Sequence, residues 1–141
     1  MKLLSIVMIS LILVTTACSS LLSGGEELTI PSQWKLMSFS RAGDEITVVE
    51  GSTVTLEFGA DGQLGGTGGC NGFGALYEVK NDMLIIKEIV STLMACMDDG
   101  IMEQETQYFS ALQSATKYEI SGDHLTIFFG EAEDTLNFVK Q

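Results

Sequence analysis

The sequence contains few basic residues and no cluster of them. It has 7 Lys and Arg against 19 Asp and Glu, which gives a formal net charge of −12. Contact with nucleic acid phosphates requires clustered Lys and Arg, and so acidic a surface repels them. The composition therefore excludes nucleic acid binding.

Histidine is nearly absent as well, since His124 is the only one. A Ser-His-Asp catalytic group would have to combine it with Ser121 and Asp123. Neighbouring residues of a strand point to opposite faces, and the sequence has no G-x-S-x-G elbow. We therefore expect no catalytic residues and no enzyme activity.

Ligands for a metal ion are also scarce. Soft sulfur atoms gather in "LMACMDDGIME", where Met94, Cys96, Met97 and Met102 would suit Cu(I). Methionine is a common core residue, however, and the single histidine lies far away in the sequence. Asp98-Asp99-Gly100 lacks the spaced oxygen ligands of a calcium loop. We expect neither a metal ion nor another cofactor.

Glycine, by contrast, is abundant in one stretch, "GGTGGCNGFG" from Gly65 to Gly74. A phosphate-binding Walker loop needs a lysine after its last glycine, and none follows here. The dinucleotide pattern G-x-G-x-x-G fails too, because Asn71 or Tyr77 stands at its last position. The stretch therefore does not indicate a nucleotide site.

The N-terminus has the features of a signal peptide. Lys2 precedes an uncharged apolar run from Leu3 to Val14, which is too short for a lasting membrane span. The ending "LVTTAC" resembles a bacterial lipobox, in which the signal is removed and Cys18 becomes the lipidated N-terminus. An ordinary secretory signal with an incidental cysteine is the alternative.

This N-terminus predicts both the domain organisation and the location. We expect a signal peptide at 1–17, a lipidated cysteine and short tether at 18–29, and one globular domain at 30–141. Several acyl chains, such as palmitate, on one cysteine hold a protein on a membrane almost permanently. Ser19 resembles the sorting signal of outer-membrane lipoproteins, so we predict a lipid-anchored, periplasm-facing protein; a secreted or periplasmic one is the alternative.

The two remaining cysteines, Cys70 and Cys96, would lie in an oxidising compartment. A disulfide between them is the simplest prediction, and closing its loop contributes about 3–3.5 kcal/mol. Gly68, Gly69 and Gly72 would let the backbone turn close to this bridge without a clash.

Most of the domain has the alternating pattern of β-strands. Short alternating segments separated by turn residues occur at 32–40, 52–66, 74–89, 116–130 and 134–140. One segment has helical spacing instead, with Ile101, Tyr108, Phe109 and Leu112 on one face and Glu105 as a mismatch. We predict a helix at about 99–114, with the carboxylates of Asp98 and Asp99 accepting its free N–H groups. The fold class is therefore mainly β with one helix (α+β), a small antiparallel barrel-like sheet packed by that helix.

Three stretches, "GGCNGFGALYEV", "STLMAC" and "MEQETQYFSALQSATKYEISGDHLTI", resemble the META domain family, also called HslJ-like. Trp34-Lys35-Leu36 resembles the opening strand of that family, so the resemblance covers about residues 30–139. Its motif residues are here Gly69, Asn71, Ser91, Thr92, Met94 and Ala95. The resemblance implies a small barrel-like domain in envelope or secreted proteins, without an established enzymatic activity.

The resemblance also sets the functional expectation. Some members are linked to heat shock or antibiotic resistance, which implies envelope stress or antibiotic tolerance through an envelope protein partner, with a monomeric domain. A similar fold in a lipid-holding secretin pilot lipoprotein implies the alternative, a barrel that binds lipid or a small hydrophobic ligand. Its pocket would be lined by Trp34, Leu56, Phe58, Tyr77, Phe128 and Phe138. We expect these side chains to fill a core instead, because small barrels pack their interiors.

Overall fold

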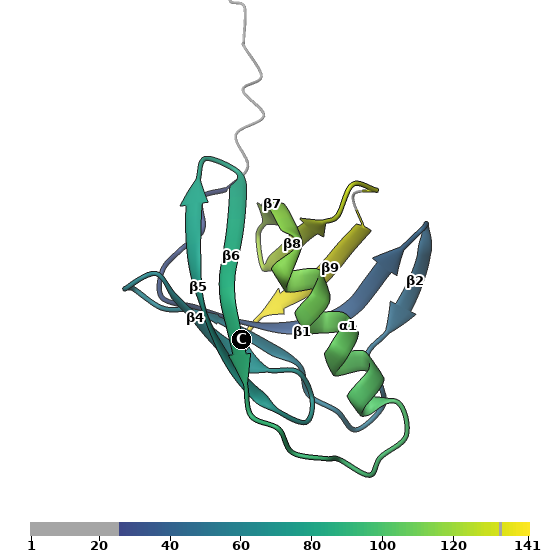
Figure 1. The fold of residues 1–141 in the computed structure, drawn as a ribbon. Helices are drawn as coiled ribbons and strands as arrows, with labels where there is room; N and C mark the ends of the chain where they lie inside the picture. The colour runs from purple at the N-terminus through teal and green to yellow at the C-terminus, as the bar shows by residue number, and fades with distance from the viewer. Residues whose placement is uncertain (1–25, 133) are drawn as a thin grey trace, which may run out of the picture.

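The computed structural model describes residues 26–132 and 134–141, which form nine strands and one α-helix (Figure 1). In chain order these are β1 (Ser32–Arg41), β2 (Asp44–Thr47), β3 (Thr55–Phe58), β4 (Gln63–Thr67), β5 (Gly72–Lys80), β6 (Met83–Ser91), α1 (Ile101–Gln113), β7 (Ala115–Ser121), β8 (His124–Phe129) and β9 (Asp134–Lys140). The predicted signal peptide and Cys18 lie outside the described residues.

Eight of the strands close into an antiparallel barrel. Strands β3 to β9 follow one another in the sheet, and β1 pairs with β3 through Ser32–Lys35 and with β9 through Trp34–Ser40. The fold class predicted from the sequence is thereby confirmed. The strand β2 was not predicted; it pairs with β1, outside the ring, and its four residues are all exposed.

The helix α1 covers the weakest seam of this barrel. Strands β6 and β7, which α1 connects, share a single residue pair, Met83 with Lys117. The side chains of Tyr108 and Leu112 on α1 are fully buried in the barrel core. The Tyr108 hydroxyl also donates a hydrogen bond to the main-chain oxygen of Thr55 on β3, at 3.1 Å. The helix therefore covers a seam where two strands pair at a single position, and it is also hydrogen-bonded to β3.

The helix begins later than predicted and without the expected caps. It starts at Ile101, after Gly100, whose φ of 83° favours glycine. Neither Asp98 nor Asp99 caps it with a side chain; the main-chain oxygen of Asp98 accepts from the Ile101 N–H at 3.4 Å. The expectation of carboxylate caps was wrong, because the N-cap position is taken by Gly100, which has no side chain to accept the free N–H groups. Within residues 26–132 and 134–141, no helix is both long and apolar enough to cross a membrane.

The core is filled by alternate residues of every barrel strand. Trp34, Leu56, Phe58, Tyr77 and Phe138 are buried in one continuous cluster, as expected for a packed interior. Their polar atoms are satisfied locally, since the Trp34 indole donates to Ser32 Oγ at 2.9 Å and the Tyr77 hydroxyl to the Gly59 oxygen at 2.9 Å.

Phe128 is the exception among the predicted interior residues. It alternates with the buried Leu125 and Ile127 and is only half-buried, so it lies on the outer face of β8. The Lys117 ammonium on the paired strand β7 stands 4.4 Å from the centre of its ring. The prediction that Phe128 points inward was wrong, because "TIFF" places two phenylalanines side by side and only one can face the core.

Connections between antiparallel strands alternate between the two ends of the barrel. One end, called here the terminal end, carries the β3–β4, β5–β6 and β7–β8 turns. Both ends of the described chain lie there: Glu26 Oε2 accepts from the Gly122 N–H at 2.6 Å, and the Gln141 N–H donates to the Gln33 oxygen at 2.9 Å. The opposite end, the loop end, carries the β4–β5 turn (residues 68–71) and the β6–α1 connection (residues 92–100), seen at the bottom of Figure 1.

Candidate functional site

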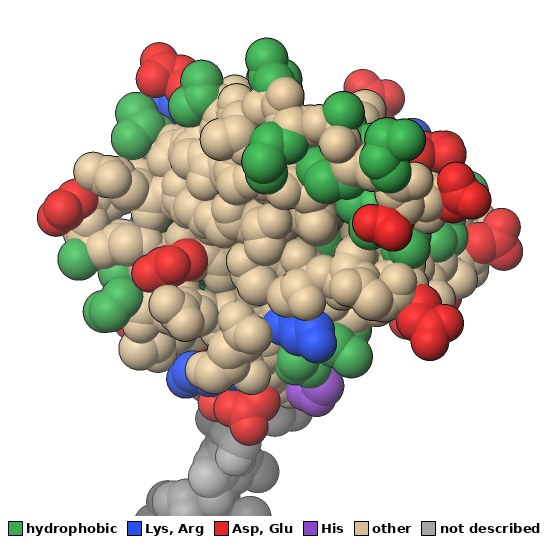
Figure 2. Space-filling view, turned by 90° about the horizontal axis from the view of Figure 1, so that it is seen from below, with side chains coloured by type: hydrophobic (Ala, Val, Ile, Leu, Met, Phe, Trp, Pro, Cys, Tyr) green, Lys and Arg blue, Asp and Glu red, His purple; other side chains and the backbone are tan. Residues whose placement is uncertain are grey.

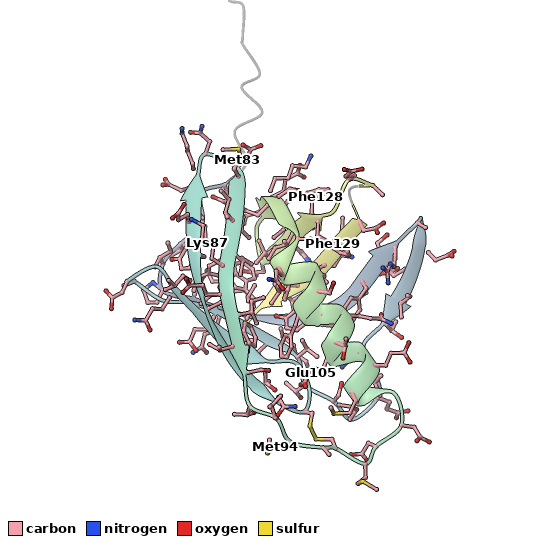
Figure 3. The ribbon with its side chains drawn as sticks, viewed as in Figure 1. Met83, Lys87, Met94, Glu105, Phe128 and Phe129 are labelled. Carbon is pink, nitrogen blue, oxygen red and sulfur yellow. A yellow bond between two sulfur atoms is a disulfide. The ribbon has the colours of Figure 1, made fainter. Side chains whose placement is uncertain are left out.

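A buried carboxylate organises the loop end of the barrel. Glu105 lies on α1 with its side chain almost fully buried, facing the β4–β5 turn (Figure 3). Its Oε2 accepts from the main-chain N–H groups of Cys70, at 3.1 Å, and Asn71, at 2.5 Å. Its Oε1 accepts from the Asn71 side-chain amide at 2.6 Å. One side chain thus satisfies three donors of a turn that forms no regular sheet.

Asn71 extends this network to the β6–α1 connection. Its Oδ1 accepts from the Thr92 hydroxyl at 2.8 Å and from the Met94 N–H at 2.7 Å. Its Nδ2 donates to the Met94 oxygen at 3.2 Å as well as to Glu105. The Asn71 side chain is fully engaged. Helix, glycine-rich turn and the 92–94 backbone are therefore held together by two buried side chains.

The neighbouring Gln104 holds a third segment, the connection between β2 and β3. Its Oε1 accepts from the Val49 N–H at 2.6 Å, and its Nε2 donates to Ser52 Oγ at 3.0 Å. Gln104 is also buried. Two consecutive polar residues of α1 thus tie two different loops to the first turns of the helix.

The glycine-rich stretch serves the close approach of the helix. A Cβ on Gly68 would stand 2.5 Å from the Cγ of Glu105 and 2.9 Å from the Cζ of Phe109, so these two side chains or the helix that carries them would have to shift. Gly69 has a φ of 115° and lies against Gln104, where only glycine is unstrained. The glycines therefore provide room for the carboxylate and its helix.

The predicted disulfide between Cys70 and Cys96 is confirmed. Its Cα atoms are 6.0 Å apart, and it links the β4–β5 turn to the β6–α1 connection across 26 residues of sequence. With the Asn71 bonds to Met94, it fixes residues 92–96 at two points. We call residues 92–100 the clamped loop.

The motif residues take different parts in this site. Gly69 and Asn71 lie in the turn, and Thr92 and Met94 bond to Asn71, the former through its hydroxyl and the latter through its backbone. Ser91 ends β6, and the side chains of Ser91, Thr92, Met94 and Ala95 are all exposed. Among the described residues no group of three His, Cys, Asp or Glu side chains is placed to hold a metal ion.

Sequence reasoning missed Glu105 and Gln104. Glu105 interrupts the apolar face of the predicted helix and was interpreted as a mismatch. A charged residue at a position that periodicity places in the core was the available signal, because such a residue needs buried partners. Its partners could not be identified from local spacing, since they lie 34 and 35 residues earlier in the chain.

A shallow groove of about 210 Å³ lies apart from this site, between α1 and the β1–β2 hairpin. Phe39, Ile46 and Phe129 form its apolar part. Its remaining lining consists of Arg41, Thr106, Gln107, Ser110 and Ala111. Of the residues that the structure describes, no Asp or Glu lines the groove, although the chain as a whole is strongly acidic.

Fold and site together define a small closed β-barrel whose loop end is held by a buried polar network and a disulfide. The chain belongs to the META domain family, whose sequence pattern matches residues 26–141. No curated protein matches the chain.

Three solved structures resemble it. An NMR structure of a protein from Burkholderia xenovorans is 25% identical with a TM-score of 0.69, over 79% of this chain and 82% of that one. A second NMR structure is 21% identical with a TM-score of 0.58, over 77% and 87%. A crystal structure of a DUF4847 family protein from Bacteroides vulgatus ATCC 8482 is 12% identical with a TM-score of 0.58, over 77% and 92%. The last two show likeness of fold alone.

Proposed function

We propose that this protein is a non-catalytic, lipid-anchored META domain of the bacterial outer membrane. It faces the periplasm and supports tolerance of envelope stress or antibiotics through contacts with an envelope protein. One observation carries the proposal: the barrel interior is occupied by the protein's own side chains, so recognition falls to the outer surface.

The engagement of the described polar and sulfur groups at the loop end supports a non-catalytic role. Both oxygens of Glu105 are engaged by N–H donors, and the Cys70 and Cys96 sulfurs are joined to each other. His124 stands opposite Ser121 in the β7–β8 hairpin, where both are exposed and lie far from the buried network. A hydrolytic site would need a base held against its nucleophile, with a third group to orient it.

Lipid anchoring rests on Cys18 and is tested by labelling. Growth with labelled palmitate should label the wild-type protein, whereas the Cys18→Ala variant should carry no label. The Cys96→Ala variant is the matched control, because it removes a different cysteine and should keep the label. An unlabelled wild-type protein, or a labelled Cys18→Ala variant, would refute the anchor.

The choice between protein contacts and a bound ligand is tested by native mass spectrometry. The described residues contain the whole barrel and its core, so residues 19–141 exported behind a cleavable signal form a suitable sample. A bare polypeptide mass under native conditions supports recognition by the surface. Additional mass that is lost on denaturation would instead support the ligand-binding alternative.

The groove between α1 and the β1–β2 hairpin favours a second candidate function. Apolar walls from Phe39, Ile46 and Phe129, with Arg41 beside them, suit a small apolar molecule that carries a carboxylate. At about 210 Å³ the groove holds only a small ligand or one end of a longer one. Titration with decanoate tests this candidate; Arg41→Gln should weaken binding, and Lys80→Gln, on the far end of β5, should not.

A further inference from the structure

We propose that the clamped loop, together with Val90, is the docking surface for an envelope protein that offers an apolar pocket bordered by Lys or Arg. This deepens the proposed function and rests on it, because it assigns the protein contact to one place. Four side chains form the apolar patch of this surface: Val90, Leu93, Met94 and Met97.

Exposure singles out this patch. Among the large apolar side chains that the structure describes, the four most exposed are those of the patch, with Leu93 at 97% and Met97 at 92%. Isolated exposed apolar residues need no explanation, but four within eight consecutive positions mark a contact surface. Figure 2 looks at the molecule from the side at the bottom of Figure 1, where the loop lies, and shows hydrophobic side chains on the surface beside acidic ones.

The patch is presented on a fixed backbone. The disulfide holds Cys96 between Met94 and Met97, and Asn71 holds both main-chain groups of Met94. A loop ordered in advance loses little entropy on binding, so more of the contact energy is available for affinity. Methionine adds an unbranched side chain that adapts to the shape of its partner.

The charge around the patch defines the partner's chemistry. Asp98, Asp99 and Glu103 follow the patch directly, and no Lys or Arg occurs between Lys87 and Lys117. A complementary surface therefore combines an apolar pocket with basic residues at its rim. A second copy of this chain would bring the same acidic residues into contact, which opposes self-association.

The position of the loop argues against a lipid bilayer as the occupant. Connections of the barrel alternate between its ends, so the clamped loop lies at the end opposite Glu26, where the described chain begins. Figure 3 shows Met83 and Met94 at opposite ends of β6. A chain tethered through its N-terminus thus directs the patch away from its own membrane, and the acidic residues repel anionic headgroups.

Photo-crosslinking in living cells tests the proposal with the full, lipidated chain. A photoreactive phenylalanine analogue replaces Leu93 or Met97 in turn, and Ile85 or Leu76, exposed on the outer face of the barrel, in the controls. We expect one protein adduct of the same mass from both loop positions and none from the controls. Adducts at twice the chain mass, adducts only with lipid, or equal yields from the wall would overturn the proposal.

Charge reversal then separates specific docking from simple capture. Asp98→Lys with Asp99→Lys should lower the adduct yield at least about tenfold, whereas Asp61→Lys, on the β3–β4 turn of the terminal end, should leave it unchanged. Replacing a rim Lys or Arg of the identified partner by Glu should restore crosslinking to the reversed loop. Equal yields from the reversed loop and from wild type would refute the predicted basic rim.

Two further measurements keep the outcomes distinct. Palmitate labelling and membrane fractionation of each variant report the anchor, so a lost adduct with an intact anchor contradicts the docking surface alone. Flotation of residues 19–141 with vesicles of phosphatidylethanolamine and phosphatidylglycerol reports the bilayer alternative. Binding that disappears on Leu93→Asp and Met97→Asp would assign the patch to a membrane and overturn the protein partner.

Discussion

At the scale of single residues, Glu105 lets a glycine-rich turn leave the sheet without unpaired donors. Buried N–H groups without partners cost free energy comparable to a lost hydrogen bond. The carboxylate of Glu105 accepts hydrogen bonds from three N–H donors of the turn. Asn71 in turn accepts hydrogen bonds from Thr92 and Met94. One hydrogen-bond network therefore joins residues from three separate segments of the chain.

Removal of this carboxylate should be costly. Glu105→Ala removes the acceptor of three hydrogen bonds at a largely buried site and should lower the free energy of unfolding by about 3 kcal/mol. Urea unfolding followed by tryptophan fluorescence measures the loss. The matched control is Glu103→Ala, an exposed glutamate on the same helix, which should change stability by less than about 0.5 kcal/mol. Equal losses for the two variants would contradict the role of the network.

Gly68 should be far less replaceable than a nearby glycine. The Cβ of Gly68→Ala would overlap Glu105 and Phe109, so we expect a loss of about 2–3 kcal/mol. Gly74→Ala is the control, since its nearest neighbour would be 4.0 Å away and its φ is not positive. The control should stay within about 1 kcal/mol of wild type. Unfolding curves for the two variants give the comparison directly.

At the scale of elements, the clamped loop is the least regular part of the barrel, yet it is fixed twice. The segment forms no helix or strand between Ser91 and Ile101. Its rigidity comes from the disulfide and from Asn71 instead. Loss of either attachment should loosen this segment before the barrel itself.

Reduction of the disulfide should therefore destabilise the protein while the barrel persists. Opening a loop of 26 residues removes about 3.5 kcal/mol in the chain-entropy model. Thermal melts with and without reductant should show a clearly lower midpoint, with native-like far-UV dichroism before melting. The Cys70→Ser, Cys96→Ser double variant should melt like the reduced protein. An unchanged midpoint would show that the bridge contributes nothing.

Elements with an apolar face were predictable from the sequence, and elements without one were not. The alternation in "SQWKLMSFS" and "DTLNFVK" indicated β1 and β9, because one face of each strand is buried in the core. The four residues of β2 are all exposed, so they carry no such pattern. The helix was placed to within two residues at each end, but its start was assigned to aspartates because the Gly100 turn cannot be seen in periodicity.

The candidate site was predictable only in part. Two cysteines in a chain with a predicted signal peptide indicated the disulfide without knowledge of the fold. The bonds of Glu105 to the turn arise from barrel closure, which brings distant segments together, and no local pattern contains that information. Phe128 shows the same limit, since two adjacent phenylalanines leave the inward one undetermined until the register is known.

At the scale of the whole molecule, stability should fall in strongly alkaline solution. Burial raises the pKa of Tyr108 well above its ordinary value of 10.0. The unfolded chain therefore releases this proton above about pH 10 while the native protein keeps it, so stability is lost as pH rises. The expected slope approaches 1.4 kcal/mol per pH unit for this one group.

The variant Tyr108→Phe isolates this effect. It loses the hydrogen bond to Thr55 and should be about 1 kcal/mol less stable at pH 8. Between pH 10 and 11 it should lose less stability than wild type, because the titrating phenol is gone. Urea unfolding at a series of pH values gives both slopes, and parallel slopes would contradict the assignment.

The even number of strands in the ring has a consequence for the connectivity of the chain. Because β1 and β9 pair and the Gln33 oxygen accepts from the Gln141 N–H, the end of the last strand lies beside the start of the first. A short peptide linker could therefore join the two ends into a circle without breaking any strand pairing. The same barrel should therefore form from a circularly permuted chain, in which the strands are synthesised in another order. A gene that begins at the Asn81-Asp82 turn should encode such a chain.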